Sequence, residues 1–366
     1  MYGMWCKETD GDLMSDLMEY KCRNCGGYLE FDAVLQKLKC PYCESIFDIS
    51  EFEDETKDTK EENVSPGWSE DELEHMYVYG CKSCGGEIIG DDTLGATRCP
   101  YCGNTVVMKE QFSGDLRPDL IIPFAKTKEE AVRNLEGHVK KSIFAPKSYK
   151  SRESLEEIRG VYVPFWLYDT DADFDMDFAA RVMGRSWREG DFICQEYKDF
   201  RIHKAGSVDF KDVPVDASTK MADDLMDALE PFDMKDAVPF NPVYMAGYAA
   251  DRYDVDQYEN ESRLDNRISD AVNSDIRNSL TEYASLKYVG GHVHVGQKHA
   301  KYVLLPVWIL SSVWNDEIYT YAMNGQTGKV SGRIPVDPVN VRKYWLKYST
   351  VFAVLVFIIS MIGLII

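Results

Sequence analysis

The arrangement of the cysteines constrains this chain more than any other feature of its sequence. Eight of the ten cysteines form four Cys-x2-Cys pairs, with fourteen residues between the two pairs of each set. Every cysteine of the second set lies 59 residues after its counterpart, and Cys-x2-Cys-Gly-Gly and Cys-Pro-Tyr-Cys occur in both sets. The eight residues are Cys22, Cys25, Cys40, Cys43, Cys81, Cys84, Cys99 and Cys102. The sequence therefore contains an internal duplication of a small module.

Each module has the composition of a metal-dependent fold. A Cys-x2-Cys turn points two sulfur atoms at a common ion, and two such turns complete a tetrahedral site. A module of about thirty residues with few apolar side chains needs the metal in order to fold. We therefore expect two zinc ribbons, over residues 20–50 and 77–109, and two Zn²⁺ ions, one in each ribbon.

Redox chemistry is the competing interpretation, because Cys-Pro-Tyr-Cys is also a dithiol motif of glutaredoxins. In that fold the motif follows a strand and opens a helix. Here each copy has a partner pair 18 residues upstream, which favours metal binding. Structural disulfides are not expected, because nothing in the sequence indicates an oxidising compartment. The remaining thiols are Cys6, read as free, and Cys194, read as a small apolar residue on a strand.

The charge balance disfavours nucleic-acid binding. The chain has 62 acidic and 41 basic residues, a net charge of −21. Basic and acidic residues are equal in number within Tyr20–Ile49 and again within Tyr79–Lys109. A surface that follows phosphates needs clustered Lys and Arg. A structural or protein-docking ribbon is therefore favoured.

An acidic segment separates the two ribbons. Eleven acidic residues and two lysines lie between Glu51 and His75. Residues 51–76 are read as a flexible, solvated linker, and the alternative is a docking segment for a basic partner.

The C-terminal residues predict a membrane anchor. Tyr348–Ile366 is nineteen residues without a charge, and at about 1.5 Å per residue it nearly matches a hydrocarbon core of about 30 Å. Arg342, Lys343 and Lys347 precede it together with aromatic residues. We expect residues 341–366 to form a basic, aromatic flank and a single transmembrane helix, with the N-terminal body in the cytoplasm. No signal peptide is recognised, so the expected topology is that of a tail-anchored protein.

Residues 110–340 predict an α+β body with no phosphate-binding, nucleophile or further metal motif, so no catalysis is expected. Thr127 opens a capped helix to about Lys141, and further helices are predicted over Met221–Leu229 and Asp256–Ser285. Strands are predicted over Gly160–Tyr168, Phe174–Val182, Phe192–His203, Leu286–Val295, Tyr302–Val313 and Glu317–Met323, with a hairpin turn at Asn324-Gly325. Val163-Pro164-Phe165-Trp166 and Leu305-Pro306-Val307-Trp308 look like one strand used twice, which indicates two related halves, about 110–250 and 251–340.

Two patterns of polar residues can be interpreted either as metal sites or as ordinary surface and strand residues. His292 and His294 share a strand face near His299, but no Asp or Glu lies at matching spacing, so surface histidines are favoured over a metal site. Asp169–Asp173 resembles the start of a calcium loop, but Phe174 and Ala180 occupy the positions of its Gly and Glu. An Asp-rich strand connection is therefore expected there.

Motifs along most of the chain carry a family resemblance. They are the two ribbons, Ile122-Pro123-Phe124, Gly160–Trp166, Val213–Ser218, Tyr244–Tyr248, Leu305–Trp308 and Asn324–Lys329. From Tyr20 to the tail, the chain resembles the bacterial membrane-anchored zinc-ribbon proteins that are labelled after the ribbon of transcription factor IIB. In some Gram-positive bacteria a similar protein is encoded beside a phage-shock-type membrane stress protein and a stomatin-like protein. The resemblance implies zinc at all eight cysteines and supplies no activity.

The sequence thus predicts a multidomain α+β protein that acts as a non-catalytic, tail-anchored adaptor for envelope-maintenance proteins, with phage-shock-type or stomatin-like proteins as partners. One alternative is a nucleic-acid-associated ribbon protein held at the membrane, and another is a thiol oxidoreductase. Glu44 follows Cys43 where Gly103 follows Cys102, so the first ribbon is expected to bind metal less tightly.

Overall fold

The structure is a computed structural model that describes residues 20–52, 77–90, 99–102, 107–111, 116–146, 149, 151–315 and 317–365. The predictions for Cys6 and for nearly all of the acidic linker at 51–76 lie outside these residues. The described chain is a mixed α+β structure with one three-stranded and one twelve-stranded sheet.

The small sheet belongs to the first ribbon and contains β1 (Glu30–Asp32), β2 (Lys37–Lys39) and β3 (Ile46–Phe47), followed by η1 (Ile49–Glu51). The large sheet contains β4 (Tyr77–Gly80), β5 (Glu87–Gly90), β6 (Val107–Gln111), β7 (Leu120–Ile121), β8 (Arg159–Glu189), β9 (Phe192–Asp216), β10 (Val238–Pro239), β11 (Ala249–Asp251), β12 (Ser285–Val295), β13 (His299–Trp314), β14 (Glu317–Asn324) and β15 (Val330–Gly332). The helices are α2 (Lys128–Lys141), α3 (Arg152–Leu155), α4 (Asp223–Asp227), η4 (Met234–Asp236), η5 (Pro242–Met245), α5 (Glu261–Asn278) and α6 (Pro338–Ile365).

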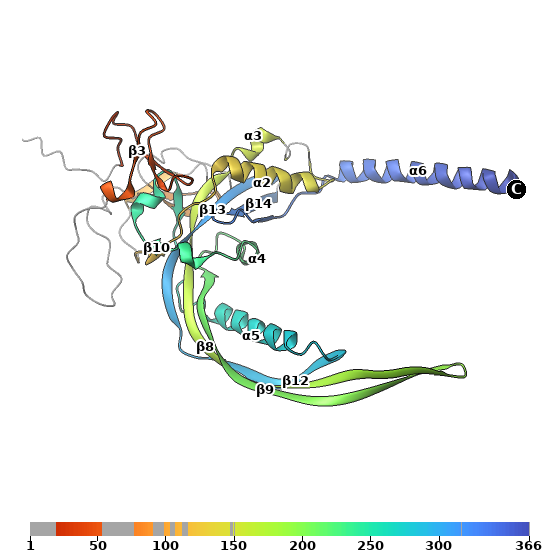
Figure 1. The fold of residues 1–366 in the computed structure, drawn as a ribbon. Coiled ribbons are helices and arrows are strands. Elements are labelled where there is room, and N and C mark those ends of the chain that lie inside the picture. Colours follow the sequence, from red (N-terminus) through yellow and green to blue (C-terminus); the bar gives the residue numbers. More distant parts are fainter. Residues whose placement is uncertain are drawn as a thin grey trace, which may run out of the picture.

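Strand β8 is one continuous element of 31 residues, where the sequence predicts two shorter strands. The Asp-rich segment Asp169–Asp173 is therefore strand, and the predicted break in it is wrong. Within it Asp171 and Asp173 are exposed while Ala172 is buried, so the segment fits the two-residue period of a half-buried strand. β9 also continues past the predicted end at His203, and β8 and β9 pair as one long hairpin (Figure 1).

The core of the body lies between the curved sheet and its helices. In Figure 1, β8, β9 and β12 bend around α5. The buried face of α5 carries Leu264, Ile268, Val272 and Ile276, and these join a core cluster with strand residues such as Phe178. The spacing of the α5 residues is the amphipathic pattern of a helix that covers a sheet.

The helix boundaries follow local capping. Thr127 and Glu130 form the predicted capping box of α2, with Glu130 N donating to Thr127 Oγ1 over 3.2 Å. Helix α5 is shorter than predicted, because Asp256 accepts the backbone N–H groups of Tyr258 and Glu259 and so holds a turn ahead of the helix. Helix α4 is likewise shorter than the predicted 221–229.

The predicted hairpin near the C-terminus is confirmed, but its turn is longer than two residues. Met323 pairs with Val330, and the intervening loop is held by the side chain of Asn324, which accepts the N–H of Gln326 over 2.8 Å. The left-handed residue is Gly328, with φ of 81°, rather than Gly325.

Helix α6 leaves the body in a defined direction. Asp337 N donates to Phe144 O over 2.9 Å, and the rings of Phe144 and Tyr344 meet edge to face with centroids 5.2 Å apart. Within α6, Pro338–Ser360 is long and apolar enough to cross a membrane, and none of it is buried in the protein. Figure 1 shows the first ribbon and α6 on opposite sides of the body.

Candidate metal centres

The four cysteines of the first ribbon converge on one point. Cys22 Sγ lies 3.4 Å from Cys43 Sγ, and Cys25 Sγ lies 3.5 Å from Cys40 Sγ. All four sulfur atoms lie within 4.8 Å of one another, and none is in a disulfide. Four thiolates at about 2.3 Å from a central ion have sulfur–sulfur edges of about 3.8 Å, so this geometry fits one metal ion.

The second ribbon repeats this arrangement. Cys81 Sγ lies 3.5 Å from Cys102 Sγ, and Cys84 Sγ lies 3.6 Å from Cys99 Sγ. Its four sulfur atoms also lie within 4.8 Å of one another. The structure thus brings all eight predicted ligands into two four-cysteine groups, as the spacing requires, and two metal ions are the expected load.

Tight turns point the sulfur atoms inward. Gly26 N donates to Cys22 O over 2.7 Å and Gly85 N donates to Cys81 O over 2.9 Å, with φ of 74° and 71°. Glu44 closes the corresponding turn of the Cys40 knuckle with φ of 59°. A residue with a Cβ pays a steric penalty in this left-handed region, so the position that departs from glycine is a strained one.

The second glycine of each Cys-x2-Cys-Gly-Gly motif has a different role, which the sequence alone did not reveal. A Cβ at Gly27 would lie 2.4 Å from Cδ2 of Tyr42, and a Cβ at Gly86 would lie 3.0 Å from Cδ2 of Tyr101. The tyrosine of each Cys-Pro-Tyr-Cys knuckle therefore packs over the opposite knuckle. This contact explains why glycine and tyrosine occur together in both modules.

Local hydrogen bonds favour the thiolate form at one exposed ligand. The Ser45 side chain and then its backbone lower the pKa of Cys43 to about 6, and Ser45 Oγ lies 3.2 Å from Cys43 Sγ. Burial has the opposite effect in the second ribbon, where it raises the pKa of Cys99. Since the thiolate is the metal-binding form, a bound cation is what makes four neighbouring thiolates compatible with burial.

The first ribbon packs on the body through its outer strand. Phe31 N donates to Ala246 O over 3.0 Å, and the rings of Phe31 and Tyr244 are 5.4 Å apart. Gln36 Nε2 donates to Phe124 O over 2.9 Å. These contacts fix the ribbon at one edge of the body.

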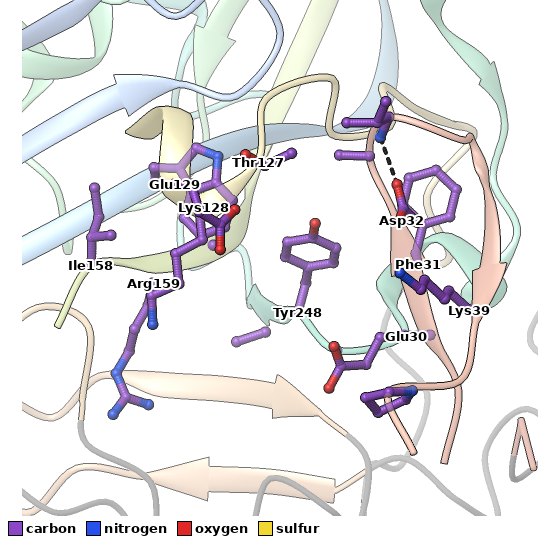
Figure 2. A pocket seen from close by; sticks show the side chains of 18 of the residues that line it. Glu30, Phe31, Asp32, Lys39, Thr127, Lys128, Glu129, Ile158, Arg159 and Tyr248 are labelled. Carbon is purple, nitrogen blue, oxygen red and sulfur yellow. Dashed lines mark hydrogen bonds between the residues drawn. The ribbon is translucent and has the colours of Figure 1, made fainter. Parts of the chain in front are cut away.

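A cleft of about 1320 Å³ lies between this ribbon and the body. Figure 2 shows Tyr248 between Glu30 of the ribbon and Arg159 at the start of β8, with Lys128 and Glu129 from α2 above. Both carboxylates and cations line the cleft, so it has no single charge that would select a ligand.

The second ribbon is joined to the body by a continuous sheet. Ile88 and Ile89 of β5 pair with Asp251 and Ala250 of β11, and β11 pairs with β8. Tyr101 of this ribbon is 6% exposed, whereas Tyr42 of the first ribbon is 73% exposed. The two modules share their cysteine motifs but differ in how deeply they are buried against the body.

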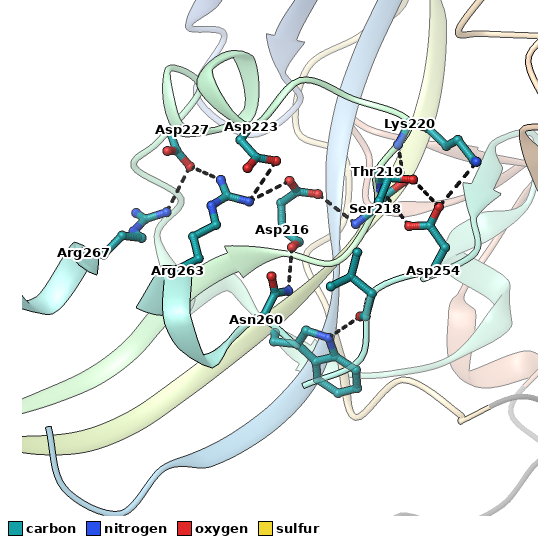
Figure 3. A network of polar contacts seen from close by, with 12 residues as sticks. Asp216, Ser218, Thr219, Lys220, Asp223, Asp227, Asp254, Asn260, Arg263 and Arg267 are labelled. Atoms are coloured by element: carbon teal, nitrogen blue, oxygen red, sulfur yellow. Dashed lines mark hydrogen bonds and ion pairs between the residues drawn. The ribbon is translucent and has the colours of Figure 1, made fainter. Parts of the chain in front are cut away.

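A polar network adjoins β11, the strand with which β5 of the second ribbon pairs. Figure 3 shows the part of this network around Asp216 and Arg263. Asp251 is 1% exposed, and burial raises its pKa to about 7. Ser218 Oγ donates to it over 2.5 Å, and Ser218 N donates to Asp216 over 2.9 Å. Arg263 bridges Asp216 at 3.0 Å and Asp227 at 2.7 Å. In the sequence, Asp216 and Ser218 belong to the motif Val213–Ser218, but no role was predicted for any residue of this network.

The histidines do not form a metal site with the residues around them. His292 and His294 are exposed, as predicted, and lie opposite Asp175 and Asp173 of β8. Carboxylates therefore do lie beside them, but on the neighbouring strand, where spacing along one strand cannot reveal them. Across the described residues, the groups of His, Cys, Asp and Glu that could hold a metal are the two four-cysteine sets.

Comparison with known proteins gives one informative relative. A protein of Bacillus subtilis (strain 168), described as the uncharacterized protein YdjG, is 34% identical over 321 residues, which cover 88% of this chain and 91% of the relative. No family model matches the chain, and no solved structure matches it.

Proposed function

This chain belongs to the same family as YdjG of Bacillus subtilis, and from that premise we propose that it is a zinc-binding, non-catalytic adaptor anchored in the cytoplasmic membrane. Its ribbons would recruit envelope-maintenance proteins to the membrane surface. The arrangement in Figure 1 carries this proposal, because the first ribbon lies on the side of the body opposite to α6. A partner that docks on this ribbon would be held near the bilayer without having to enter it.

Zinc is the metal that we propose for both sites. Closed, four-coordinate thiolate sites are typical of structural zinc, and tetrahedral four-sulfur sites also accept iron. Both four-cysteine groups leave no position open for a substrate, which supports a structural role. The metal content of the purified protein decides which metal is bound. We expect two zinc ions per molecule.

The first ribbon supports the docking part of the proposal. Tyr42 is 73%, Val34 is 68% and Ile46 is 50% exposed, so the module presents large apolar side chains to solvent. We propose that a docking protein covers these side chains. The phage-shock-type and stomatin-like proteins implied by the resemblance are the partners that we propose.

The body supports scaffolding better than catalysis. Two buried polar residues of the body, Ser218 and Asp251, are 2% and 1% exposed, and the Ser218 hydroxyl donates to the Asp251 carboxylate. A substrate therefore has no access to them. The network around Arg263 ties α4 and α5 to the end of β9.

We also infer that the body arose by duplication of one unit, with boundaries near the predicted 110–250 and 251–340. Trp166 Nε1 donates to Val255 O over 3.0 Å, a few residues before α5. Trp308 Nε1 donates to Lys126 O over 3.0 Å, just before α2. The two tryptophans are the last residues of the repeated Pro-containing motifs, so like residues make like contacts.

Backbone contacts support the same correspondence. Ala217 N donates to Pro164 O over 2.9 Å, and Gly325 N donates to Pro306 O over 2.8 Å. Val163 pairs directly with Leu305, and from this pair the two motifs run in opposite directions along antiparallel strands, so an approximate local two-fold axis relates them. β11 pairs in parallel with β8, and β7 pairs in parallel with β13. Helix α2 of the first unit packs on β14 and β15 of the second, and α5 of the second unit packs on β9 of the first as well as on β12 of its own unit.

One experiment tests the adaptor. The full-length protein is extracted from native membranes in mild detergent, assayed for zinc, and compared with Cys22→Ser/Cys43→Ser and with the control Cys194→Ser. We expect two zinc and stoichiometric membrane proteins for the parent and the control, and one zinc with loss of these partners for the double variant. Unchanged partners would refute recruitment through the first ribbon. Nuclease-sensitive recovery of nucleic-acid enzymes would favour the nucleic-acid alternative, and titratable thiols without zinc would favour the oxidoreductase.

A further inference from the structure

The end of the β8–β9 hairpin carries large apolar side chains that nothing in the described chain covers. Trp187 is 50%, Phe192 is 76% and Ile193 is 80% exposed. The last β12-paired residue of β8 is Arg181, and the strand continues to Glu189. Eight further residues extend this two-stranded tip by about 26 Å. Apolar groups on such a projection mark an interaction surface.

The apolar side chains lie on both faces of the tip. Glu189 pairs with Phe192, and Arg188 pairs with Ile193, so Phe192 and Ile193 point to opposite faces. Trp187, two residues before Glu189, shares the face of Phe192. A flat protein surface would cover one face and leave the other in water. A lipid interface surrounds an inserted tip and covers both.

The hairpin and the candidate transmembrane helix project to the same side of the molecule, as Figure 1 shows. The direction of α6 is held by the contact of Tyr344 with Phe144. The charge-free run starts at Tyr348, about 6 Å further along the helix. The bilayer surface would therefore lie close to the body, within reach of the hairpin tip.

The charge of the hairpin also fits a lipid surface. The whole chain has a net charge of −21, which repels anionic lipids. Residues 181–201 have five basic and four acidic side chains. This part of the chain is therefore close to neutral and is not repelled by anionic lipids. Glu189 and Asp191 at the turn limit insertion to the headgroup level, where Trp187 is suited to the interface.

From these observations we propose that the β8–β9 tip rests in the interface of the bilayer that α6 crosses and forms a second membrane contact. This proposal rests on the anchor in the proposed function and goes beyond it, because it fixes the orientation of the body. The shorter β13–β14 hairpin is its counterpart in the other unit. From Trp308 that hairpin continues six residues to Trp314, whereas β8 continues 23 residues from Trp166 to Glu189. The extension is specific to one unit.

The test uses photocrosslinking of the full-length chain in vesicles of phosphatidylethanolamine and phosphatidylglycerol. A p-benzoylphenylalanine replaces Phe192, Val208 or Phe357 in separate variants. Val208 is 38% exposed on the same hairpin but nearer the body, and Phe357 is 66% exposed on α6. These two positions are the negative and the positive control. Mass spectrometry identifies the adducts.

We expect phospholipid adducts at positions 192 and 357, with at least tenfold fewer at 208. Adducts at 357 but not at 192 would overturn the second contact and leave the anchor in place. Adducts between two protein chains at position 192 would overturn the lipid contact and show that the tip binds a second copy of the chain. The absence of lipid adducts at both 192 and 357 would overturn the anchor and, with it, the second contact.

Discussion

Ser218 donates its hydroxyl hydrogen to the carboxylate of Asp251 over 2.5 Å, in a region from which solvent is excluded. Asp251 pairs with Ile88 of the second ribbon, so this hydrogen bond lies where the ribbon joins the body. The next residue, Arg252, donates to Glu87 of the ribbon over 3.1 Å. The attachment of a metal module is therefore built around a buried titratable group.

The stability of the protein should depend on pH through Asp251. Its folded pKa is raised to about 7, against about 3.9 in an unfolded chain. Between these values the folded state binds the extra proton, so this group makes the protein more stable as pH falls from above 7 toward 4. We expect Asp251→Asn to remove this component and to raise the melting temperature at pH 8. Thermal unfolding in detergent between pH 5.5 and 8 measures this dependence of the melting temperature on pH.

The control for this experiment is Asp224→Asn, because the Asp224 side chain is 73% exposed. Its pH profile should follow that of the parent protein. An Asp251→Asn variant with the parent's slope would show that this carboxyl does not govern the profile.

The two knuckle glycines should tolerate alanine to different degrees. Gly86→Ala meets Tyr101, which is buried and cannot move away, whereas Gly27→Ala meets Tyr42, which is 73% exposed and can rotate outward. We expect Gly86→Ala to cost about 1–3 kcal/mol and Gly27→Ala clearly less. Melting temperature and zinc content measured on both variants decide this. A larger loss for Gly27→Ala would contradict the difference in embedding.

Loss of metal should also affect the two ribbons unequally. Cys81→Ser disrupts a module whose strand β5 belongs to the large sheet, and Cys22→Ser disrupts a module with its own small sheet. Each should lose one zinc of two. We expect Cys81→Ser to destabilise the body by about 3 kcal/mol more, which is roughly 6–12 °C in melting temperature. Equal shifts would mean that both ribbons support the body alike.

Replacing either of the two motif tryptophans should lower the stability of the protein by a similar amount. Trp166→Phe and Trp308→Phe each leave one backbone carbonyl without its indole donor, so each should cost about 1–3 kcal/mol. Trp314→Phe is the control, because its indole nitrogen makes no hydrogen bond with the described residues. A large loss for one motif tryptophan and none for the other would argue against the duplication. Thermal unfolding compares all three.

Features encoded by neighbours in sequence were predictable. The spacing of the eight cysteines fixes the two four-cysteine groups, and the Thr127–Glu130 pair marks the start of α2. The apolar run after Tyr348 predicts a helix, and α6 contains this run as far as Ile365, the last residue that the structure describes. These signals depend on turns, caps and composition, which operate over a few residues.

Features that depend on distant pairing were not predictable. Asp169–Asp173 read as a connection, because a row of aspartates is a poor strand signal unless one knows that its outer face meets solvent. Asp251 had no recognisable role until β5 and β11, which lie far apart in the chain, were seen as neighbours in the sheet. Likewise, the carboxylates that face His292 and His294 come from β8.

The unbroken course of β8 has a mechanical consequence. One end of this strand pairs with β11, beside the second ribbon, and the other end is the hairpin tip. Because β8 is paired with β9 over most of its length, the number of residues in the two arms determines how far, along the curve of the sheet, that ribbon lies from the surface that the tip contacts. Removing two paired residues from each arm would shorten the β8–β9 hairpin by about 7 Å, and every remaining side chain would stay on its own face of the sheet. The length of the β8–β9 hairpin thus limits the distance between the second ribbon and the surface that the tip contacts.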